Sequence, residues 1–263
     1  MDVTIKTALI SVSDKTGVID FAKALSQQGV KIISTGGTAT RLTEAGLDVV
    51  SVDTVTGFPE MMDGRVKTLH PKIHGALLGL RDKTEHTDAM KRHAIEPIDL
   101  VCVNLYPFEA TVAREDCTIE EAIENIDIGG PSMIRSAAKN HRFVTVVTGP
   151  SQYGRVIEQM QGNNGAVSGP LRCELARAAF GLTAAYDAAI SKYLNGKAGI
   201  EFPDRVSIAV TREKTLRYGE NPHQAGALYR LPATSESSVS NGRLLEGGTE
   251  ISFNNLLDSN AAF

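Results

Sequence analysis

The chain has 263 residues, of which 42% are hydrophobic and 22% charged, with 27 Lys and Arg against 31 Asp and Glu. This composition is ordinary for a soluble globular protein with room for one large or two modest domains. The net charge of -4 gives no overall attraction to nucleic acid or to an anionic membrane, although it allows a local basic pocket for a small anion.

Cysteine usage and hydropathy indicate where the protein works. Cys102, Cys117 and Cys173 form no C-x-x-C pair and cannot all be joined in disulfides. No apolar run approaches the ~18 residues of a membrane span, and the N-terminus has no cleavable signal. We therefore expect a cytoplasmic protein with reduced thiols.

Short apolar segments alternate with helical patterns through most of the chain. Each apolar segment is typical of a strand buried on both faces, and a polar or glycine-rich loop usually follows it. This alternation predicts an α/β fold, a parallel sheet flanked by helices. The predicted strands span residues 7–12, 31–34, 48–52, 99–103 and 143–148.

The loops after the first two strands have the properties of a phosphate site. Each lies between the C-terminal end of a strand and the N-terminus of a helix, where free N–H groups and the helix dipole favour an anion. A glycine pair alone is equally typical of a tight turn, but two such loops are better evidence. The candidate ligands are Ser11, Ser13, Lys15, Thr35, Gly36, Gly37 and Thr38.

A second basic feature lies in residues 63–71, inside the irregular but apolar segment 54–79. Arg65 and Lys67 are two residues apart, so an extended backbone would point both to one face, where they suit a phosphate or carboxylate. Pro71 is expected to keep the segment out of a helix. The alternative is a solvated basic turn. His70 and His74 are four apart, but the intervening proline and the lack of a third ligand argue against zinc.

Three further segments carry candidate polar groups. Asn104 and Tyr106 follow a predicted strand, although a tyrosine packed on the core is an equal alternative. Asp127 precedes two glycines and a helix expected to begin at Pro131, and the dipole should hold its carboxylate ionised. Lys139 lies on the polar face of that helix.

The last part of the chain has a different organisation. A long apolar stripe predicts a helix over residues 170–194, and glycines near residue 199 indicate a domain boundary. Residues 200–263 include a polar stretch at 234–241 and could hardly bury a core of their own. We expect domains at 1–199 and 200–263, the second being the incomplete start of a longer one.

These segments, in their order along the chain, resemble the N-terminal half of the bifunctional purine biosynthesis proteins, a known enzyme family. That family combines IMP cyclohydrolase with AICAR transformylase, AICAR being the aminoimidazole carboxamide ribonucleotide. The resemblance spans essentially the whole chain, and its motifs are long. They lie at residues 11–17, 34–38, 57–61, 63–71, 104–108, 125–130, 137–141 and 216–224.

The resemblance implies a methylglyoxal-synthase-like fold for residues 1–199, followed by the truncated start of a second α/β domain, the transformylase. It implies closure of the purine ring of formyl-AICAR to give IMP and water, the last step of de novo purine biosynthesis, with no cofactor. The implied catalytic residues are Lys67, Tyr106, Asp127 and Lys139. The positions implied to line the nucleotide, besides the phosphate loops, are Arg65, Val66, Thr68, Asn104, Ile128, Gly129 and Gly130.

Our hypothesis is that Lys139 shuttles protons, Lys67 and Tyr106 stabilise an oxyanion and Asp127 orients the amide. Which group carries each proton transfer stays open. Two alternatives are a methylglyoxal synthase, whose signature differs, and a non-catalytic nucleotide- or phosphate-sensing domain of the same fold.

The resemblance also implies a second activity for the intact protein, formylation of AICAR from 10-formyltetrahydrofolate. Arg217, Tyr218 and Asn255 match residues that contact AICAR, whereas the catalytic Lys-His pair of the family lies beyond these residues. We expect small purine nucleotides as partners, no nucleic acid or membrane, and a homodimer for the full-length protein.

Overall fold

The computed structural model describes residues 1–231, 237–242 and 250–263. Part of the polar stretch 234–241 therefore lies outside the described residues. The chain divides into two compact units, which are described separately. The first comprises residues 1–111 and 116–184, and the second comprises residues 112–115 and 185–263.

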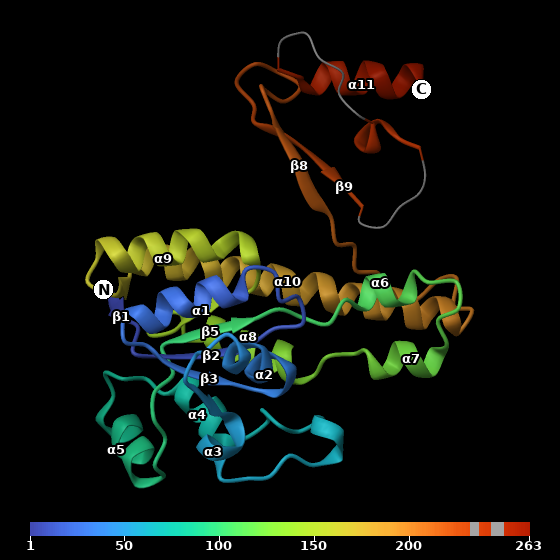
Figure 1. The fold of residues 1–263 in the computed structure, drawn as a ribbon. Helices are drawn as coiled ribbons and strands as arrows, with labels where there is room; N and C mark the ends of the chain where they lie inside the picture. Colours follow the sequence, from blue (N-terminus) through green and yellow to red (C-terminus); the bar gives the residue numbers. More distant parts are fainter. Residues whose placement is uncertain (232–236, 243–249) are drawn as a thin grey trace. The chain divides into compact units, whose positions relative to one another are not determined.

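A five-stranded sheet in the order β4-β3-β2-β5-β6 forms the centre of the first unit (Figure 1). All four neighbouring pairs are parallel, which confirms the predicted parallel sheet. A short antiparallel pair, β1 (Val3–Thr4) with β7 (Ala166–Val167), lies outside it and was not predicted. The five strands are β2 (Thr7–Ser11), β3 (Lys31–Ser34), β4 (Val49–Ser51), β5 (Leu100–Val103) and β6 (Thr145–Val147).

Helices lie on both sides of this sheet, as Figure 1 shows. The helix α1 packs on α9, and α4 packs on α8. The helices between residues 18 and 197 are α1 (Val18–Gln27), α2 (Gly36–Glu44), α3 (Val52–Thr56), α4 (Pro71–Leu78), α5 (Thr84–Arg92), α6 (Phe108–Val112), α7 (Ile119–Glu124), α8 (Gly129–Lys139), α9 (Tyr153–Gly162) and α10 (Gly169–Lys197). Two short 3-10 helices, η1 (Met62–Gly64) and η2 (Pro150–Gln152), also lie in this part of the chain.

Two expectations about helix starts are wrong. The helix α4 begins at Pro71, where no helix was expected, because proline lacks the N–H that the first helical position leaves unpaired. The ring of His70 accepts a hydrogen bond from the N–H of Lys72 and so caps α4. The helix α8 begins at Gly129 rather than at Pro131.

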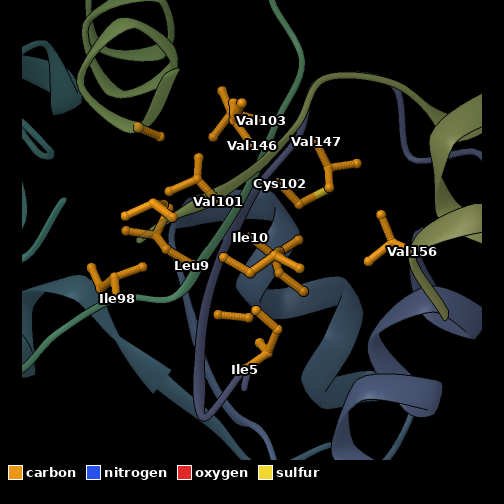
Figure 2. Packing of buried hydrophobic residues seen from close by; sticks show 14 of the residues in the cluster. Ile5, Leu9, Ile10, Ile98, Val101, Cys102, Val103, Val146, Val147 and Val156 are labelled. Carbon is orange, nitrogen blue, oxygen red and sulfur yellow. The ribbon is translucent and has the colours of Figure 1, made fainter. Parts of the chain in front are cut away.

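The core consists of side chains from both faces of the central strands. Figure 2 shows Leu9 of β2 beside Val101 of β5, and Ile10 of β2 beside Cys102 of β5. Each is at most 1% exposed. A fully buried aliphatic side chain contributes roughly 1.5–3 kcal/mol through the hydrophobic effect. Burial on both faces explains why these strands are continuous apolar runs.

A buried carboxylate sets the start of the two central strands. One carboxylate oxygen of Asp99 accepts hydrogen bonds from the N–H groups of Lys6 and Thr7, at 2.8 and 2.9 Å, and the other pairs with Arg81. Asp99 is only 4% exposed. This contact fixes β2 against β5, so that Ser11 lies opposite Val103 where both strands end.

The second unit contains an antiparallel hairpin of β8 (Thr211–Leu216) and β9 (Gly226–Arg230). It also contains the 3-10 helix η3 (Val239–Asn241) and the helix α11 (Phe253–Ala262). A capping box between Ser252 and Asn255 begins α11.

Candidate active site

The loops that follow β2, β3 and β5 meet at the carboxyl edge of the sheet. The hydroxyls of Ser11 and Thr35 are 3.0 Å apart. The side-chain oxygen of Asn104 accepts hydrogen bonds from the N–H groups of Ser13 and Asp14, at 2.6 and 3.0 Å. The two predicted phosphate loops are therefore adjacent, and Asn104 holds the first of them in shape.

Two lysines approach the first turn of α2. A Cβ atom built on Gly36 would lie 3.7 Å from the Nζ of Lys67, and one on Gly37 would lie 4.0 Å from the Cε of Lys15. Gly36 has a φ of 46°, in the left-handed region that favours glycine. This helix start thus combines a dipole, close backbone access and two cations from separate loops, which suits a phosphate group.

The side chain of Thr38 joins the two loops. It is 4% exposed, and its hydroxyl accepts a hydrogen bond from the N–H of Val12 at 3.1 Å and donates one to the carbonyl of Val12 at 3.0 Å. A contact between Thr38 and a ligand would therefore come from its backbone.

Arg65 and Lys67 do not share an extended face as predicted, because the chain forms successive turns there. Arg65 has φ and ψ of -56° and -27°, and the N–H of Lys67 donates to the carbonyl of Gly64 at 3.2 Å. Arg65 is 65% exposed and pairs with Glu124, whereas Lys67 is 16% exposed and pairs with Glu60. The two cations therefore have different surroundings.

The sequence pattern assigned no role to Glu60 or Glu124. No spacing in the sequence predicts that Glu60 contacts Lys67 or that Glu124 contacts Arg65. A cavity of about 250 Å³ lies beside Lys67, and Glu60 and Val66 also line it.

Side chains fill the space beside the two glycines that begin α8. A Cβ atom on Gly129 would lie 2.7 Å from the hydroxyl oxygen of Thr68, and one on Gly130 would lie 2.3 Å from a carboxylate oxygen of Asp127. The N–H of Gly130 donates to the other carboxylate oxygen at 2.8 Å. The glycines thus allow Thr68 and Asp127 to approach the start of this helix, where Ile128 is exposed.

The pKa of Asp127 differs from the expectation that the helix dipole holds this carboxylate ionised. Burial raises the pKa of its carboxyl, and the hydrogen bonds from the N–H groups of Gly130 and Tyr106 offset this effect only in part. Tyr106 contacts this carboxyl group through its backbone N–H, and the residue is 50% exposed. The group is therefore easier to protonate than an ordinary aspartate.

Lys139 lies at the opposite end of α8 from Asp127. It is exposed and is the last residue of the helix, ten residues after Gly129, a separation of about 15 Å along the axis. The structure thus brings Lys15 and Lys67 together at α2, and Tyr106 and Asp127 together at α8. Within this chain it leaves Lys139 apart from them.

In the second unit, the three predicted AICAR contacts lie near one another. The guanidinium of Arg217 donates to the hydroxyl of Tyr218 at 3.2 Å, which lowers the pKa of that tyrosine. The carbonyl of Tyr218 accepts a hydrogen bond from the N–H of Phe253, and Asn255 caps the same helix. Arg217 and Tyr218 come directly after β8.

Across the parts of the chain that the structure describes, no group of His, Cys, Asp and Glu side chains could hold a metal ion. His74 instead contacts the hydroxyl of Ser136 at 2.9 Å. None of the helices in the described residues has the length and apolar character needed to cross a membrane.

Comparison with known proteins shows what the chain is similar to. Residues 17–132 match a model of the MGS-like domain, and residues 137–263 match a model of the AICARFT/IMPCHase bienzyme. The bifunctional purine biosynthesis protein PurH of Magnetococcus marinus is 56% identical over 264 residues, a match that covers 98% of this chain. The chain is a protein like the N-terminal half of PurH.

The match covers only part of that relative. It spans 49% of the length of the Magnetococcus protein. The crystal structure of ForH is similar over 73% of this chain and all of the ForH chain, with 32% identity and a TM-score of 0.64. The five-stranded sheet is thus an MGS-like domain, and a partial AICARFT/IMPCHase domain follows it.

Proposed function

We propose that the first unit is an IMP cyclohydrolase of purine biosynthesis, which closes the ring of formyl-AICAR to give IMP. The observation that carries this proposal is the approach of Lys15 and Lys67 to the first turn of α2 in a chain similar to PurH. The phosphate of the nucleotide binds there, between the Ser13 loop and residues 35–38, with Asn104 supporting the first loop.

The reaction needs positioning and charge stabilisation. The carboxamide nitrogen of the substrate attacks the formyl carbon, a C–N bond forms, and negative charge develops on the former formyl oxygen. Holding the two groups together contributes up to about 7–11 kcal/mol. Lys67 and the exposed hydroxyl of Tyr106 are donors for that oxygen, and Asp127 accepts a proton or a hydrogen bond from the amide.

Loss of water completes the ring and requires a proton donor. We propose Lys139 for this proton, as the resemblance implies, although it lies at the far end of α8 from Asp127 in this chain. A Lys139→Ala variant with an unchanged cyclisation rate would remove Lys139 from the scheme.

The intact protein would also formylate AICAR with 10-formyltetrahydrofolate as co-substrate, using Arg217, Tyr218 and Asn255 to contact the nucleotide. We further propose that the full-length protein is a cytoplasmic homodimer. The cyclohydrolase step itself needs no cofactor. These statements rest on the similarity to PurH and on the half of its length that the chain matches.

The test is the ultraviolet absorbance of purified chain mixed with formyl-AICAR, with no cofactor or metal added. We expect IMP to form, and turnover to fall at least a hundredfold in Lys67→Ala, since one lost oxyanion donor costs about 10²–10³-fold. Lys31→Ala is the control. Lys31 forms an exposed ion pair with Glu96 and lies at the start of β3, whereas the phosphate loop follows the end of β3. Binding of IMP without turnover would favour the nucleotide-sensing alternative.

A further inference from the structure

The carboxylate of Glu60 contacts Lys67 directly, yet the proposed reaction gives it no role. One of its oxygens accepts a hydrogen bond from the Lys67 ammonium. Glu60 is 45% exposed, whereas Lys67 is only 16% exposed. Both side chains line the cavity of about 250 Å³ beside the loop. The carboxylate therefore borders a cavity that Lys67 also lines.

The loop backbone is shaped around this carboxylate. Gly64 has a φ of 86°, and a Cβ atom there would lie 2.8 Å from the other oxygen of Glu60. The N–H of Gly64 donates to the carbonyl of Met61 at 3.1 Å, and the N–H of Lys67 donates to the carbonyl of Gly64 at 3.2 Å. Two consecutive turns thus bring together the side chains at the two ends of residues 60–67.

The same ammonium lies beside the helix start where the phosphate is proposed to bind. Its Nζ is 3.7 Å from the position of a Cβ on Gly36. An ammonium has three donors, so Lys67 can bond Glu60 and a phosphate together. The carboxylate and the phosphate then share one cation and repel each other. Glu60 therefore has two opposite effects, since it fixes the ammonium and weakens the attraction for the ligand.

We propose that Glu60 is a positioning residue, which fixes the Lys67 ammonium beside α2 and lowers the affinity of the site for phosphate. The predicted effect of Glu60 on turnover rests on the proposed function. The predicted effect of Glu60 on phosphate binding rests only on the presence of the anion site. Removing the charge should thus tighten binding and slow the reaction, two changes that a purely structural residue would not produce together.

The first test is calorimetric titration of the whole chain with inorganic phosphate. For Glu60→Gln we expect the Kd to fall about tenfold, which corresponds to ~1.4 kcal/mol. Glu96→Gln is the matched control, because Glu96 forms a Lys–Glu pair with Lys31 at 2.8 Å and is 70% exposed. Its Kd should equal that of the wild type. Thermal unfolding of each variant checks that the fold is retained.

The second test is steady-state cyclisation of formyl-AICAR. We expect Glu60→Gln to lower KM and to lower kcat about tenfold or more, since small misplacements of a reacting group can cost about 10²-fold. Glu60→Asp keeps the charge but shortens the side chain. Its phosphate Kd should stay within about twofold of the wild type, by the Coulomb argument, while its kcat falls.

The outcomes separate the two proposals. If the wild type binds no phosphate, the phosphate site of the proposed function is wrong and the role of Glu60 falls with it. If the wild type binds phosphate and Glu60→Gln binds it no more tightly, only the role of Glu60 is overturned. Tight binding by Glu60→Asp would also contradict the proposal, because the repelling charge is still present there.

Discussion

Asp127 illustrates how much the environment of one residue decides. The carboxyl group lies next to a helix N-terminus, yet burial raises its pKa above the ordinary value of 3.8. The ionised form is therefore disfavoured in the folded state relative to the unfolded chain. The protonated Asp127 carboxyl therefore stabilises the folded state fully at a pH below the ordinary pKa. This stabilisation is lost as the pH rises through the raised pKa of the folded state.

A comparison with Asp127→Asn tests this sign. The asparagine cannot ionise, so we expect the free energy of unfolding of the wild type, relative to that of the variant, to decrease as the pH rises from about 4 towards neutrality. Urea denaturation of both proteins at several pH values measures this difference. A difference that increases with pH would mean that the N–H donors of Gly130 and Tyr106 outweigh burial.

Gly130 is the second residue with a specific requirement. A Cβ atom there would overlap a carboxylate oxygen of Asp127 at 2.3 Å and lie 3.0 Å from the side chain of Leu105. We expect Gly130→Ala to cost about 1–3 kcal/mol of stability, as overpacking does, and to lower cyclisation by displacing Asp127. Chemical denaturation and the absorbance assay measure the two effects.

Gly154 in α9 provides the control for Gly130, because nothing lies within 4 Å of a Cβ atom there. Gly154→Ala should stabilise the protein by about 0.5–1 kcal/mol through helix propensity alone. If Gly130→Ala behaved in the same way, the close approach of Asp127 to this helix would be wrong.

At the scale of elements, Asp99 connects the beginnings of β2 and β5 with Arg81. It is 4% exposed and accepts two backbone hydrogen bonds in addition to the ion pair. We expect Asp99→Ala to cost about 3–5 kcal/mol, because a half-buried guanidinium and two N–H groups lose their acceptor. Asp82→Ala is the control, since its pair with Arg142 is exposed, and should cost about 1 kcal/mol or less.

Urea denaturation of both variants measures the contrast between these two ion pairs. Equal effects would show that Asp99 does not hold the strands together. A selective effect of Asp99→Ala would instead explain how the loops after β2 and β5 come into register at the opposite edge, where the candidate site lies.

At the scale of the whole molecule, the five-stranded sheet and the residues proposed for cyclisation all belong to residues 1–184. We therefore expect a chain that ends at Gly199 to fold and to form IMP at the rate of the 263-residue chain. Circular dichroism and the absorbance assay measure both properties. A folded but inactive shorter chain would mean that residues 200–263 complete the site.

Much of this architecture could be predicted because its signals are local. The parallel strands are buried on both faces, so Leu9 and Val101 belong to continuous apolar runs that a sequence reveals directly. Turns are less readable, and the two errors at residues 65–71 have one cause. Residue types and spacing predict an extended backbone at Arg65 and Lys67 and no helix at Pro71. Backbone hydrogen bonds instead close turns before residue 70, and α4 begins at Pro71.

The alternation of strands and helices, the loops that suit phosphate and the family resemblance can all be predicted from the sequence, because each depends on neighbouring residues. The contacts between side chains, in contrast, become visible only in the folded chain. Lys67 reaches Gly36, Glu60 binds Lys67, Thr68 fills the space at Gly129, and Lys139 lies a helix length from Asp127. Such contacts depend on how separate loops are packed on one sheet edge, and side-chain identities and spacing do not encode that packing locally.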